Sequence, residues 1–357
     1  MDIPSEPYTG SESTAAPARL EVAVVIVTYR SAPLTIACLQ SLERERTGCA
    51  LHIRAIVVDN ASGDIAEISA AVAQRGWASW VTLLAAPKNG GFAYGNNLGI
   101  QHACAARTPA YLFLLNPDTE VRSGAVAALV RFLEAHPEAA VAGPSFETRD
   151  GRDWSVAFRF PTLLGELEQG LKLGLATRLL ERWAVVRHMG ERSETVDWVS
   201  GSAMMIRPDA FATVGGMDEN YFLFFEETDL CRRMRGAGFT ICYVPQSRVM
   251  HIGGATTDIR KRRPPYWFDS RRRYFALSFG IAHAMLIDIV AVGAHCLGAL
   301  KRLLQGRPHS GTPRFVRDLI HHSIIWRCNR SIAPMRSRTL LAGCAAKPGD
   351  AVAQPRT

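Results

Sequence analysis

An aspartate stands at the end of a long apolar run near the middle of the chain. Residues 111–115 are apolar or aromatic, and the run stops at Asn116, Pro117 and Asp118. A carboxylate at the end of a buried strand is a hard oxygen ligand that can hold a divalent cation against the oxygens of a diphosphate. Taken alone, the run is explained more simply by a Pro-Asp turn or by the cap of the next helix.

A second acidic group, made of Glu226, Glu227 and Asp229, follows an aromatic stretch at residues 221–225. If a helix begins near Glu226, the three acids lie in its first turn, where the helix dipole favours negative charge. A charged helix terminus is therefore one explanation. The functional interpretation is that one carboxylate, partly desolvated by the phenylalanines, is a general base toward an acceptor hydroxyl.

Strands and helices must position these residues, and a strand-then-helix pattern repeats through the first part of the chain. Continuous apolar strands suit a parallel sheet covered on both faces, whose ligands bind beyond the carboxyl ends of the strands. The predicted fold class is therefore α/β. The predicted strands are residues 20–27, 53–58, 80–85, 111–115, 141–142 and 239–244, and the predicted helices are residues 33–46, 65–75 and 123–136.

Polar residues follow the first three strands. Thr28, Tyr29 and Arg30 end the first. Asp59 ends the second, where its carboxylate can accept hydrogen bonds from a base or ribose or can start an Asx turn. A glycine-rich run at residues 88–99 follows the third and is predicted to be a loop that brings backbone amides to an anion before a helix begins. Its spacing is neither a P-loop nor a dinucleotide fingerprint, and glycine turns are also ordinary connectors.

Two later stretches add candidate ligands. Residues 196–206 form a strand-like run interrupted near Gly201 and Ser202, where a glycine indicates a bulge or a close backbone approach. Trp198 offers a stacking surface to a sugar or fills the core, and we assign these three residues to acceptor binding. A lone histidine beside a glycine turn, such as His251, is usually structural, but a site with Asp118 and a diphosphate has room for a nitrogen ligand.

Composition limits the classes of protein. The chain has 357 residues and 48% hydrophobic content, enough for a large globular core. Its eight cysteines include no C-x-x-C pair, which argues against a zinc site or a disulfide framework and favours a reducing cytoplasm. Residues 1–20 and 334–357 have the composition of disordered tails, and the first lacks the order of a secretory signal.

The net charge of +8 is concentrated late in the chain. Basic runs at residues 260–263 and 271–273 bracket the aromatic residues 266–268, and an apolar segment at 275–300 follows. Basic residues, interfacial aromatics and an apolar helix indicate an anionic membrane surface, whereas no interleaved stacking aromatics indicate nucleic acid.

The apolar segment has three interpretations. It is almost long enough to span a bilayer, but it contains His283, Asp288 and His295. An aspartate at mid-membrane costs roughly 2.5 to 3.5 kcal/mol on insertion scales. We therefore favour a helix in or against the membrane interface, with a true span and a soluble packed helix as the alternatives.

Taken in order, these stretches resemble the family-2 inverting glycosyltransferases of GT-A fold, and most closely the rhamnosyltransferase-like members that build bacterial surface polysaccharides. The resemblance spans residues 22–257. It rests on the ordered set of motifs at residues 25–30, 57–63, 89–99, 115–118, 200–204, 215–218 and 224–231, and on His251.

The resemblance implies a Rossmann-like, mixed and mostly parallel central sheet flanked by helices, with a catalytic domain at residues 21–257. Beyond it, the basic, aromatic and apolar residues described above predict a helical, membrane-associating extension at 258–333. The expected donor is a nucleotide sugar, best dTDP-rhamnose, and the expected acceptor is polyprenyl-linked or a glycan. The enzyme would be cytoplasmic and peripheral at the inner face of the cell membrane.

The resemblance also assigns roles to residues. In the family's D-x-D motif the first position is relaxed, here to Asn116, so Asp118 carries most of the binding of Mg²⁺ or Mn²⁺, with His251 as a further ligand. The second member of the acidic pair is the base, here Glu227 where aspartate is common, with Glu226 or Asp229 as alternatives. The residues implied for donor binding, besides Asn116 and Asp118, are Thr28, Tyr29 and Arg30 in the nucleotide pocket, Asp59 and Asn60 at the base, and Asn89, Gly91 and Asn97 in the donor loop.

Two other functions are weighed against this one. A sugar-phosphate nucleotidyltransferase would share the strand order, but it should carry a basic, glycine-rich loop directly after the first strand, and residues 28–32 do not. A non-catalytic sugar-nucleotide-binding protein would keep the pocket without turnover. The presence of Asp118, Glu227 and His251 argues against that reading, and only activity separates the two.

Overall fold

The structure is a computed structural model that describes residues 19–154, 156–171, 174–252, 262–306 and 312–325. The predicted tails at residues 1–20 and 334–357 lie outside the described residues except for Arg19 and Leu20, and Arg260 and Lys261 of the first basic run lie outside them too. The sections below concern the described ranges.

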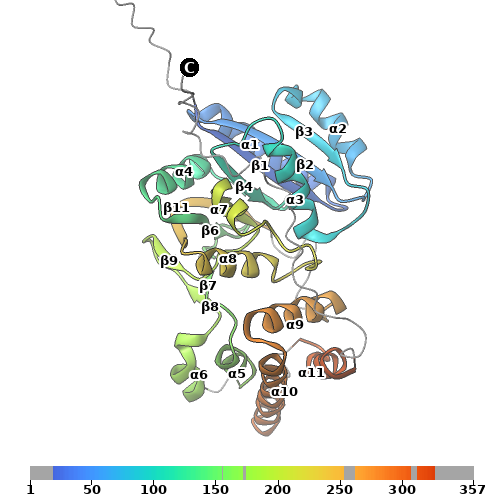
Figure 1. Cartoon of the computed structure of the whole chain (residues 1–357), viewed down its shortest axis with the longest axis vertical. Helices are drawn as coiled ribbons and strands as arrows, with labels where there is room; N and C mark the ends of the chain where they lie inside the picture. Colours follow the sequence, from blue (N-terminus) through green and yellow to red (C-terminus); the bar gives the residue numbers. More distant parts are fainter. Residues whose placement is uncertain (1–18, 155, 172–173, 253–261, 307–311, 326–357) are drawn as a thin grey trace, which may run out of the picture.

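A mixed β-sheet forms the centre of the molecule (Figure 1), and in the described ranges it has nine strands. Its first four strands in spatial order, β3, β2, β1 and β4, are parallel. β10 then runs antiparallel between β4 and β6, and β11 pairs parallel with β6 and antiparallel with β5 and β9. The predicted α/β class is confirmed, with the parallel half of the sheet built from the first strands.

The element bounds agree with most of the predicted ranges. The strands are β1 (Glu21–Thr28), β2 (His52–Asp59), β3 (Val81–Ala85), β4 (Tyr111–Leu115), β5 (Thr119–Val121), β6 (Ala139–Glu147), β7 (Val156–Phe158), β8 (Val186–His188), β9 (Glu194–Val196), β10 (Ala203–Ile206) and β11 (Thr240–His251). The helices are α1 (Ala32–Gly48), α2 (Ile65–Gln74), α3 (Gly91–Cys104), α4 (Ala125–Ala135), α5 (Leu163–Leu171), α6 (Gly174–Leu180), α7 (Pro208–Thr213), α8 (Glu226–Gly236), α9 (Pro265–Phe279), α10 (Ile281–Leu304) and α11 (Phe315–Ile320).

Alternate residues of the central strands feed two separate cores. In β1, Val22, Val24 and Ile26 pack with α1, α2 and α4 on one face, whereas Ala23 and Val25 pack with α3, α7 and α8 on the other. Because side chains alternate across a strand, a run that is apolar at every position must be covered on both faces. This is why β1 and β4 read as unbroken apolar runs in the sequence.

Two predicted boundaries are wrong, and one predicted interruption is longer than expected. Most of the glycine-rich run at residues 88–99 is not a loop, because α3 already begins at Gly91. The run at 196–206 is interrupted as predicted, but the interruption spans all residues between the end of β9 at Val196 and the start of β10 at Ala203. The last strand does not stop at residue 244, since β11 passes a register shift and continues to His251.

The apolar segment at residues 275–300 is also not one helix. It divides at Gly280, whose φ of 85° ends α9 and allows α10 to start in a new direction. Figure 1 shows α5, α6, α9, α10 and α11 together at the end of the molecule away from β1 to β3. α10 has 24 residues and is, within the described ranges, the one helix long and apolar enough to cross a membrane by length and composition.

α10 packs closely on α5 through small residues. A Cβ added to Gly298 would lie 2.4 Å from the carbonyl oxygen of Gly170, and one added to Gly170 would lie 2.6 Å from the Cβ of Ala294. Such distances leave no room for a side chain at either glycine. The α5 helix, far away in sequence, is therefore part of the C-terminal helical layer.

Two of the three arginines at residues 271–273 are buried in the protein and do not form the lipid-facing basic surface that the sequence predicted. Arg271 is buried and forms ion pairs with Glu166 of α5 and Asp288 of α10. Arg273 is buried and pairs with Asp218. Charged side chains away from water need such partners, and these are supplied from other elements. Asp288, which made a membrane span costly, is thus the partner of a buried arginine.

Arg262 and Arg263 of the first basic run are also engaged by the protein itself. Arg262 forms a bidentate pair with Asp318, at 2.6 and 2.9 Å. The Arg263 guanidinium lies 4.7 Å from the centre of the Trp267 ring. These two arginines, the described part of the basic run before α9 (the basic preface), therefore hold parts of the C-terminal extension together, and they are not a free cationic patch.

Candidate active site

The turn after β4 places Asp118 beside His251. β5 follows the turn immediately and pairs Thr119 with His251 at the end of β11. The backbone carbonyl of Asp118 accepts a hydrogen bond from the Ile252 amide at 3.0 Å. As a result, Asp118 Oδ2 lies 3.5 Å from His251 Nε2, and both side chains are largely buried. The sequence separation of 133 residues is closed by this one strand pair.

Several polar atoms around this pair lack partners within the described residues: Asp118 Oδ1, Asn116 Oδ1 and His251 Nδ1. Buried polar groups are normally satisfied, so a group of orphaned ligand atoms indicates a species that binds there. Carboxylate oxygen and imidazole nitrogen suit a divalent cation. In the described ranges no cluster of three or more His, Cys, Asp or Glu side chains could hold a metal, so a cation at this pair needs further ligands other than these side chains.

The second acidic group lies at the start of α8, as predicted, with Glu226, Glu227 and Asp229 in its first turn. The two residues before it are strained. Phe224 and Phe225 both have left-handed backbones, with φ of 72° and 69°. For residues other than glycine, this region costs roughly 1–2 kcal/mol per residue. Such strain persists only where surrounding contacts over-determine the backbone, which is typical of functional sites.

The two glutamates differ in their electrostatic surroundings. Burial raises the pKa of Glu226 well above its usual value, and the neighbouring charge of Glu227 raises it further. Burial also raises the pKa of Glu227, but hydrogen bonds from the backbone amides of Glu227, Thr228 and Gly201 counteract it. Glu227 therefore gives up its proton more readily, which suits a general base. In the described part of the chain, one oxygen of each carboxyl group, Oε2, has no partner.

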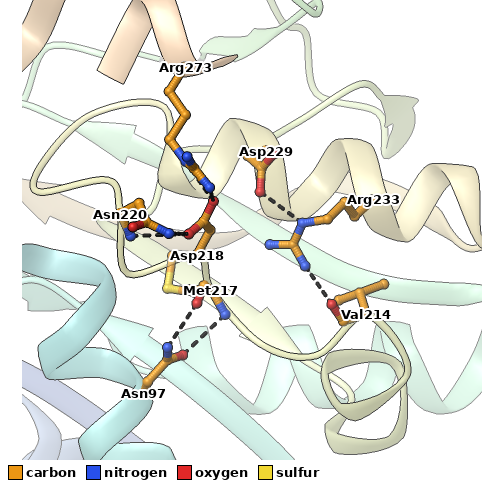
Figure 2. Close-up of polar contacts among 8 residues, drawn as sticks. All are labelled: Asn97, Val214, Met217, Asp218, Asn220, Asp229, Arg233 and Arg273. Atoms are coloured by element: carbon orange, nitrogen blue, oxygen red, sulfur yellow. Dashed lines mark hydrogen bonds and ion pairs between the residues drawn. The ribbon is translucent and has the colours of Figure 1, made fainter. Parts of the chain in front are cut away.

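Asp229 is committed to an ion pair. Its Oδ2 accepts from Arg233 Nε at 2.8 Å, one helical turn later, and Arg233 Nη1 also donates to the Val214 carbonyl at 2.6 Å (Figure 2). The arrangement ties α8 to the end of α7. Asp229 therefore helps to hold α8 in place. Of the three acids, Glu226 and Glu227 are the ones with an oxygen that has no partner in the described residues.

The loop at residues 200–202 joins the two acidic groups. On one side, the Ser202 carbonyl accepts from the Asn116 amide at 2.9 Å, and Ser202 Oγ lies 3.3 Å from Asn116 Nδ2. On the other side, a Cβ added to Gly201 would lie 3.4 Å from the Cβ of Glu227. The short interruption between β9 and β10 thus places two groups on either side of one loop. One is the pair of Asp118 and His251, and the other is the acid pair, Glu226 and Glu227.

Trp198 lies near this loop but is used for packing. Its ring stacks on Phe158 with centroids 4.1 Å apart, and its indole N–H donates to the Arg159 carbonyl at 3.0 Å. The ring thereby fastens β7 to the sheet. The observed contacts favour the packing alternative for Trp198, while Gly201 and Ser202 lie at the centre of the site.

The loop after β1 is organised by a residue that the sequence analysis did not single out. Asp64 Oδ2 accepts from Thr28 Oγ1 at 2.9 Å and from the Ser31 amide at 2.7 Å. Arg30 has a left-handed backbone with φ of 54°, and its guanidinium lies 5.3 Å from the centre of the Tyr29 ring. Because Asp64 is 33 residues or more from these partners, no local pattern could have identified it.

Asp59 and Asn60 fix the chain that follows β2 through hydrogen bonds. Asp59 accepts from the Ser62 amide at 2.9 Å, the Ser62 hydroxyl at 2.6 Å and the Gly63 amide at 3.1 Å, which is the Asx-type turn left open by the sequence. Asn60 Nδ2 donates to Asn89 Oδ1 and to the Gly91 carbonyl, both at 3.0 Å. The β2 end and the start of α3 are therefore one connected rim.

This arrangement matches a known family. The model of the glycosyltransferase-like family 2 matches residues 17–277, which is most of the chain. The chain belongs to glycosyltransferase family 2. The match includes every candidate site residue named above and ends within α9.

Curated relatives of this glycosyltransferase include three with rhamnosyl transfer in their names. The N-acetylglucosaminyl-diphospho-decaprenol L-rhamnosyltransferase of Mycobacterium tuberculosis is 32% identical over 145 residues, which is 40% of this chain and 46% of that protein. Rhamnosyltransferase WbbL of Escherichia coli is 29% identical over 45% of this chain and 60% of its own length. The dTDP-rhamnosyl transferase RfbF of Shigella flexneri is 24% identical over 70% and 75%. The matches to the first two thus span about half of those relatives.

Solved structures agree on the fold. GalNAc-T7 with UDP, GalNAc and Mn²⁺ superposes with a TM-score of 0.50 at 15% identity, covering 85% of this chain and 57% of that one. The mannosyltransferase PcManGT from Pyrobaculum calidifontis, in complex with GDP-Man and Mn²⁺, gives 0.50 at 16% identity, covering 92% and 87%. The predicted GT-A fold is confirmed.

In this glycosyltransferase the start of α3, at Gly91, touches the loop that precedes α8. The φ of Gly91 is 87°, and an added Cβ would lie 2.0 Å from the carbonyl oxygen of Phe222. We expect Gly91→Ala to lower the free energy of unfolding by about 2–3 kcal/mol, because both backbone strain and a clash with main chain oppose it. Denaturant unfolding measures this.

The matched control for that change is Gly124→Ala. Gly124 has a similar φ of 80°, but nothing lies within 4 Å of its added Cβ. The control therefore carries the backbone strain without the clash and should lower stability less. Equal losses in the two variants would contradict the close approach of Gly91 to Phe222.

Proposed function

We propose that this protein is an inverting glycosyltransferase that moves rhamnose from dTDP-rhamnose to a lipid-linked or polysaccharide acceptor in bacterial surface glycan synthesis. The observation that carries the proposal is the placement of the Asp118 and His251 pair and of Glu227 on the two sides of one short loop at residues 200–202. The names of the relatives support rhamnose as the sugar.

The reaction can be assigned to residues of this chain. Glu227 takes the proton from the acceptor hydroxyl while the acceptor oxygen attacks the anomeric carbon from the face opposite the diphosphate. The bond from the anomeric carbon to the diphosphate oxygen breaks, and its electron pair leaves with the nucleotide. One displacement gives inversion, and no protein nucleophile is needed.

Asp118 and His251 would hold Mg²⁺ or Mn²⁺. Two residues before Asp118, the side-chain oxygen Oδ1 of Asn116 also has no partner in the described ranges. When bound, the cation supplies neutralisation of the charge that develops on the diphosphate. The cations in the two solved structures named above support this use. Thr28 to Arg30, with the rim of Asp59, Asn60, Asn89 and Gly91, would form the nucleotide pocket.

The nucleotidyltransferase alternative is less well supported by the loop after β1. Its hydroxyl and amide groups from Thr28 and Ser31 are bound by the Asp64 carboxylate, whereas that reaction needs a basic, glycine-rich loop to hold triphosphate. An acid in this place repels phosphate. The non-catalytic binding protein is left as an outcome of the following experiment.

The test is release of nucleoside diphosphate from a panel of activated sugars led by dTDP-rhamnose, with Mn²⁺ or Mg²⁺, a lipid-linked acceptor, and a chelator control. Metal-dependent release from dTDP-rhamnose is the expected result. Release from a different donor and not from dTDP-rhamnose would show that the enzyme transfers another sugar, while the proposal of a glycosyltransferase would stand. Donor binding without release, with acceptor present, would favour the non-catalytic protein, and the absence of binding to any donor would overturn the proposal.

We also propose that the enzyme is cytoplasmic and peripheral at the inner face of the cell membrane, with α10 as its lipid-facing element. Exposed apolar side chains recur along one face of this helix with helical spacing. They are Ile281, Met285, Leu286, Ile289, Leu297, Leu300, Leu303 and Leu304. The opposite face carries Asp288, which is buried against α5 and α9 through its arginine partner. A helix with this division suits an interface better than a complete span.

We expect the double substitution Ile289→Asp and Leu297→Asp to release the protein from vesicles. Burying one such side chain contributes about 1.5–3 kcal/mol, so each loss should weaken binding by roughly tenfold or more. Leu179→Asp on α6, equally exposed at 69%, is the matched control. Vesicle co-sedimentation measures the effect.

Because Arg262, Arg271 and Arg273 form ion pairs within the protein, we expect binding to neutral vesicles to persist at high salt. Binding that requires anionic lipid and disappears with salt would contradict insertion of α10. Equal binding of the double variant and the wild type would exclude this face of α10 as the contact.

A further inference from the structure

The loop before α8, residues 215–225, leads into Glu226 and Glu227 and is held from the side of the catalytic domain by three hydrogen bonds to its backbone. Asn97 Nδ2 donates to the Met217 carbonyl at 2.8 Å, and the Met217 amide donates to Asn97 Oδ1 at 3.1 Å (Figure 2). The Phe222 carbonyl accepts from the Phe92 amide at 2.8 Å. Both partners lie on α3, the helix that begins in the donor loop.

The same loop is held from the other side by the C-terminal extension. Arg273 of α9 donates to Asp218 Oδ2 from Nε at 2.7 Å and from Nη2 at 2.5 Å. One turn earlier on that helix, Ser270 Oγ donates to the Leu223 carbonyl at 3.0 Å. The loop thus lies between the donor-binding helix and a helix that is not part of the sheet domain.

The ion pair is buried and fixed in its geometry. Asp218 is 1% exposed and Arg273 is 8% exposed. The second carboxylate oxygen, Oδ1, accepts from the Asn220 amide at 3.1 Å and from its side chain at 2.7 Å. A buried charge that loses its partner is strongly unfavourable, so the loop must move if Arg273 is removed.

Resting on the proposed function, we propose that Arg273 is a positioning residue that acts through Asp218 to hold Glu226 and Glu227 in their productive place. The strained backbone of Phe224 and Phe225 lies between Asp218 and the acid pair. Without the ion pair, this backbone relaxes and turns the start of α8, so that Glu227 moves relative to Gly201. The extension is then part of what aligns the base, in addition to any contact with lipid.

The test compares three variants of the full chain: Arg273→Ala, Asp218→Asn and Arg271→Ala. Arg271 is the matched control, because it lies in the same helix and is equally buried and ion-paired, but its partners are Glu166 and Asp288. For each variant, kcat and the donor Kd are measured with dTDP-rhamnose and compared with each other. Amide hydrogen exchange is then measured across residues 215–229.

We expect Arg273→Ala and Asp218→Asn to lower kcat by about 100-fold with donor affinity unchanged, since a displacement of about 1 Å at the reacting groups has that effect. Exchange should become faster across residues 215–229 in both variants. Arg273→Lys should restore part of the rate, because lysine supplies the charge but cannot donate to Asp218 Oδ2 from two nitrogens as the guanidinium does. Arg271→Ala should lower the Tm while leaving kcat per folded molecule and exchange in this loop as in the wild type.

Equal losses of kcat in Arg271→Ala and Arg273→Ala would overturn the proposal, and so would wild-type kcat and exchange in Arg273→Ala. If Arg273→Ala does not fold, Asp218→Asn decides, since it keeps the shape of the side chain and removes the charge. If the wild type transfers no sugar, the proposed function fails, and the exchange measurement alone decides whether Arg273 holds the loop.

Discussion

Asp118→Asn is expected to lower the metal-stimulated transfer rate by about 1000-fold. The carboxylate lies 3.5 Å from His251 with a second oxygen that has no partner in the described ranges, and asparagine keeps its shape but supplies no charge to hold a cation. Loss of one preorganised group that stabilises developing charge typically costs 100- to 1000-fold. The measurement is the transfer rate as Mn²⁺ is titrated, with donor binding followed in the same samples.

Asp150→Asn is the control for that change, because Asp150 pairs with Arg152 on the surface. It should leave the rate and its dependence on Mn²⁺ as in the wild type. A near-normal, metal-stimulated rate in Asp118→Asn would remove Asp118 from the cation site. A rate that falls equally with and without metal would show that Asp118 acts only through the fold.

Glu227→Gln is expected to lower kcat by roughly 100- to 10,000-fold while donor binding is preserved, because loss of a general base has an effect of this size. Glutamine keeps the size of the side chain and cannot accept the proton. Glu226→Gln is the matched control. Since burial and the charge of Glu227 keep Glu226 protonated to higher pH, glutamine resembles its neutral form and should be tolerated.

The pH profile provides an independent check on the base. Activity requires Glu227 without its proton, so the rate rises as pH passes through its pKa. Burial raises that pKa above 4.5, and the rising limb of kcat/KM is therefore expected above pH 4.5 in the wild type. If Glu227→Gln transfers sugar normally and Glu226→Gln does not, the roles of the two acids are reversed.

Local sequence determined the parallel strands of the sheet and the start of α8. Strands β1 and β4, and residues 55–58 of β2, are continuous apolar runs, which a sheet covered on both faces explains, and polar residues follow at their carboxyl ends. The start of α8 at Glu226 was also readable, because acids after an aromatic stretch favour a helix N-terminus. These signals survive because periodicity and dipole effects act over a few residues.

Tertiary structure decided which of the charged residues are partners. In the sequence, Arg271 and Arg273 indicate a membrane surface and Asp288 argues against a span, yet Arg271 pairs with Glu166 from 105 residues away and Arg273 with Asp218 from 55. Asp64 and the left-handed Phe224 and Phe225 carry no local pattern either. The local sequence around a charged residue is the same whether the side chain faces lipid or a buried carboxylate. Only the packing of distant elements supplies the partner that makes its burial favourable.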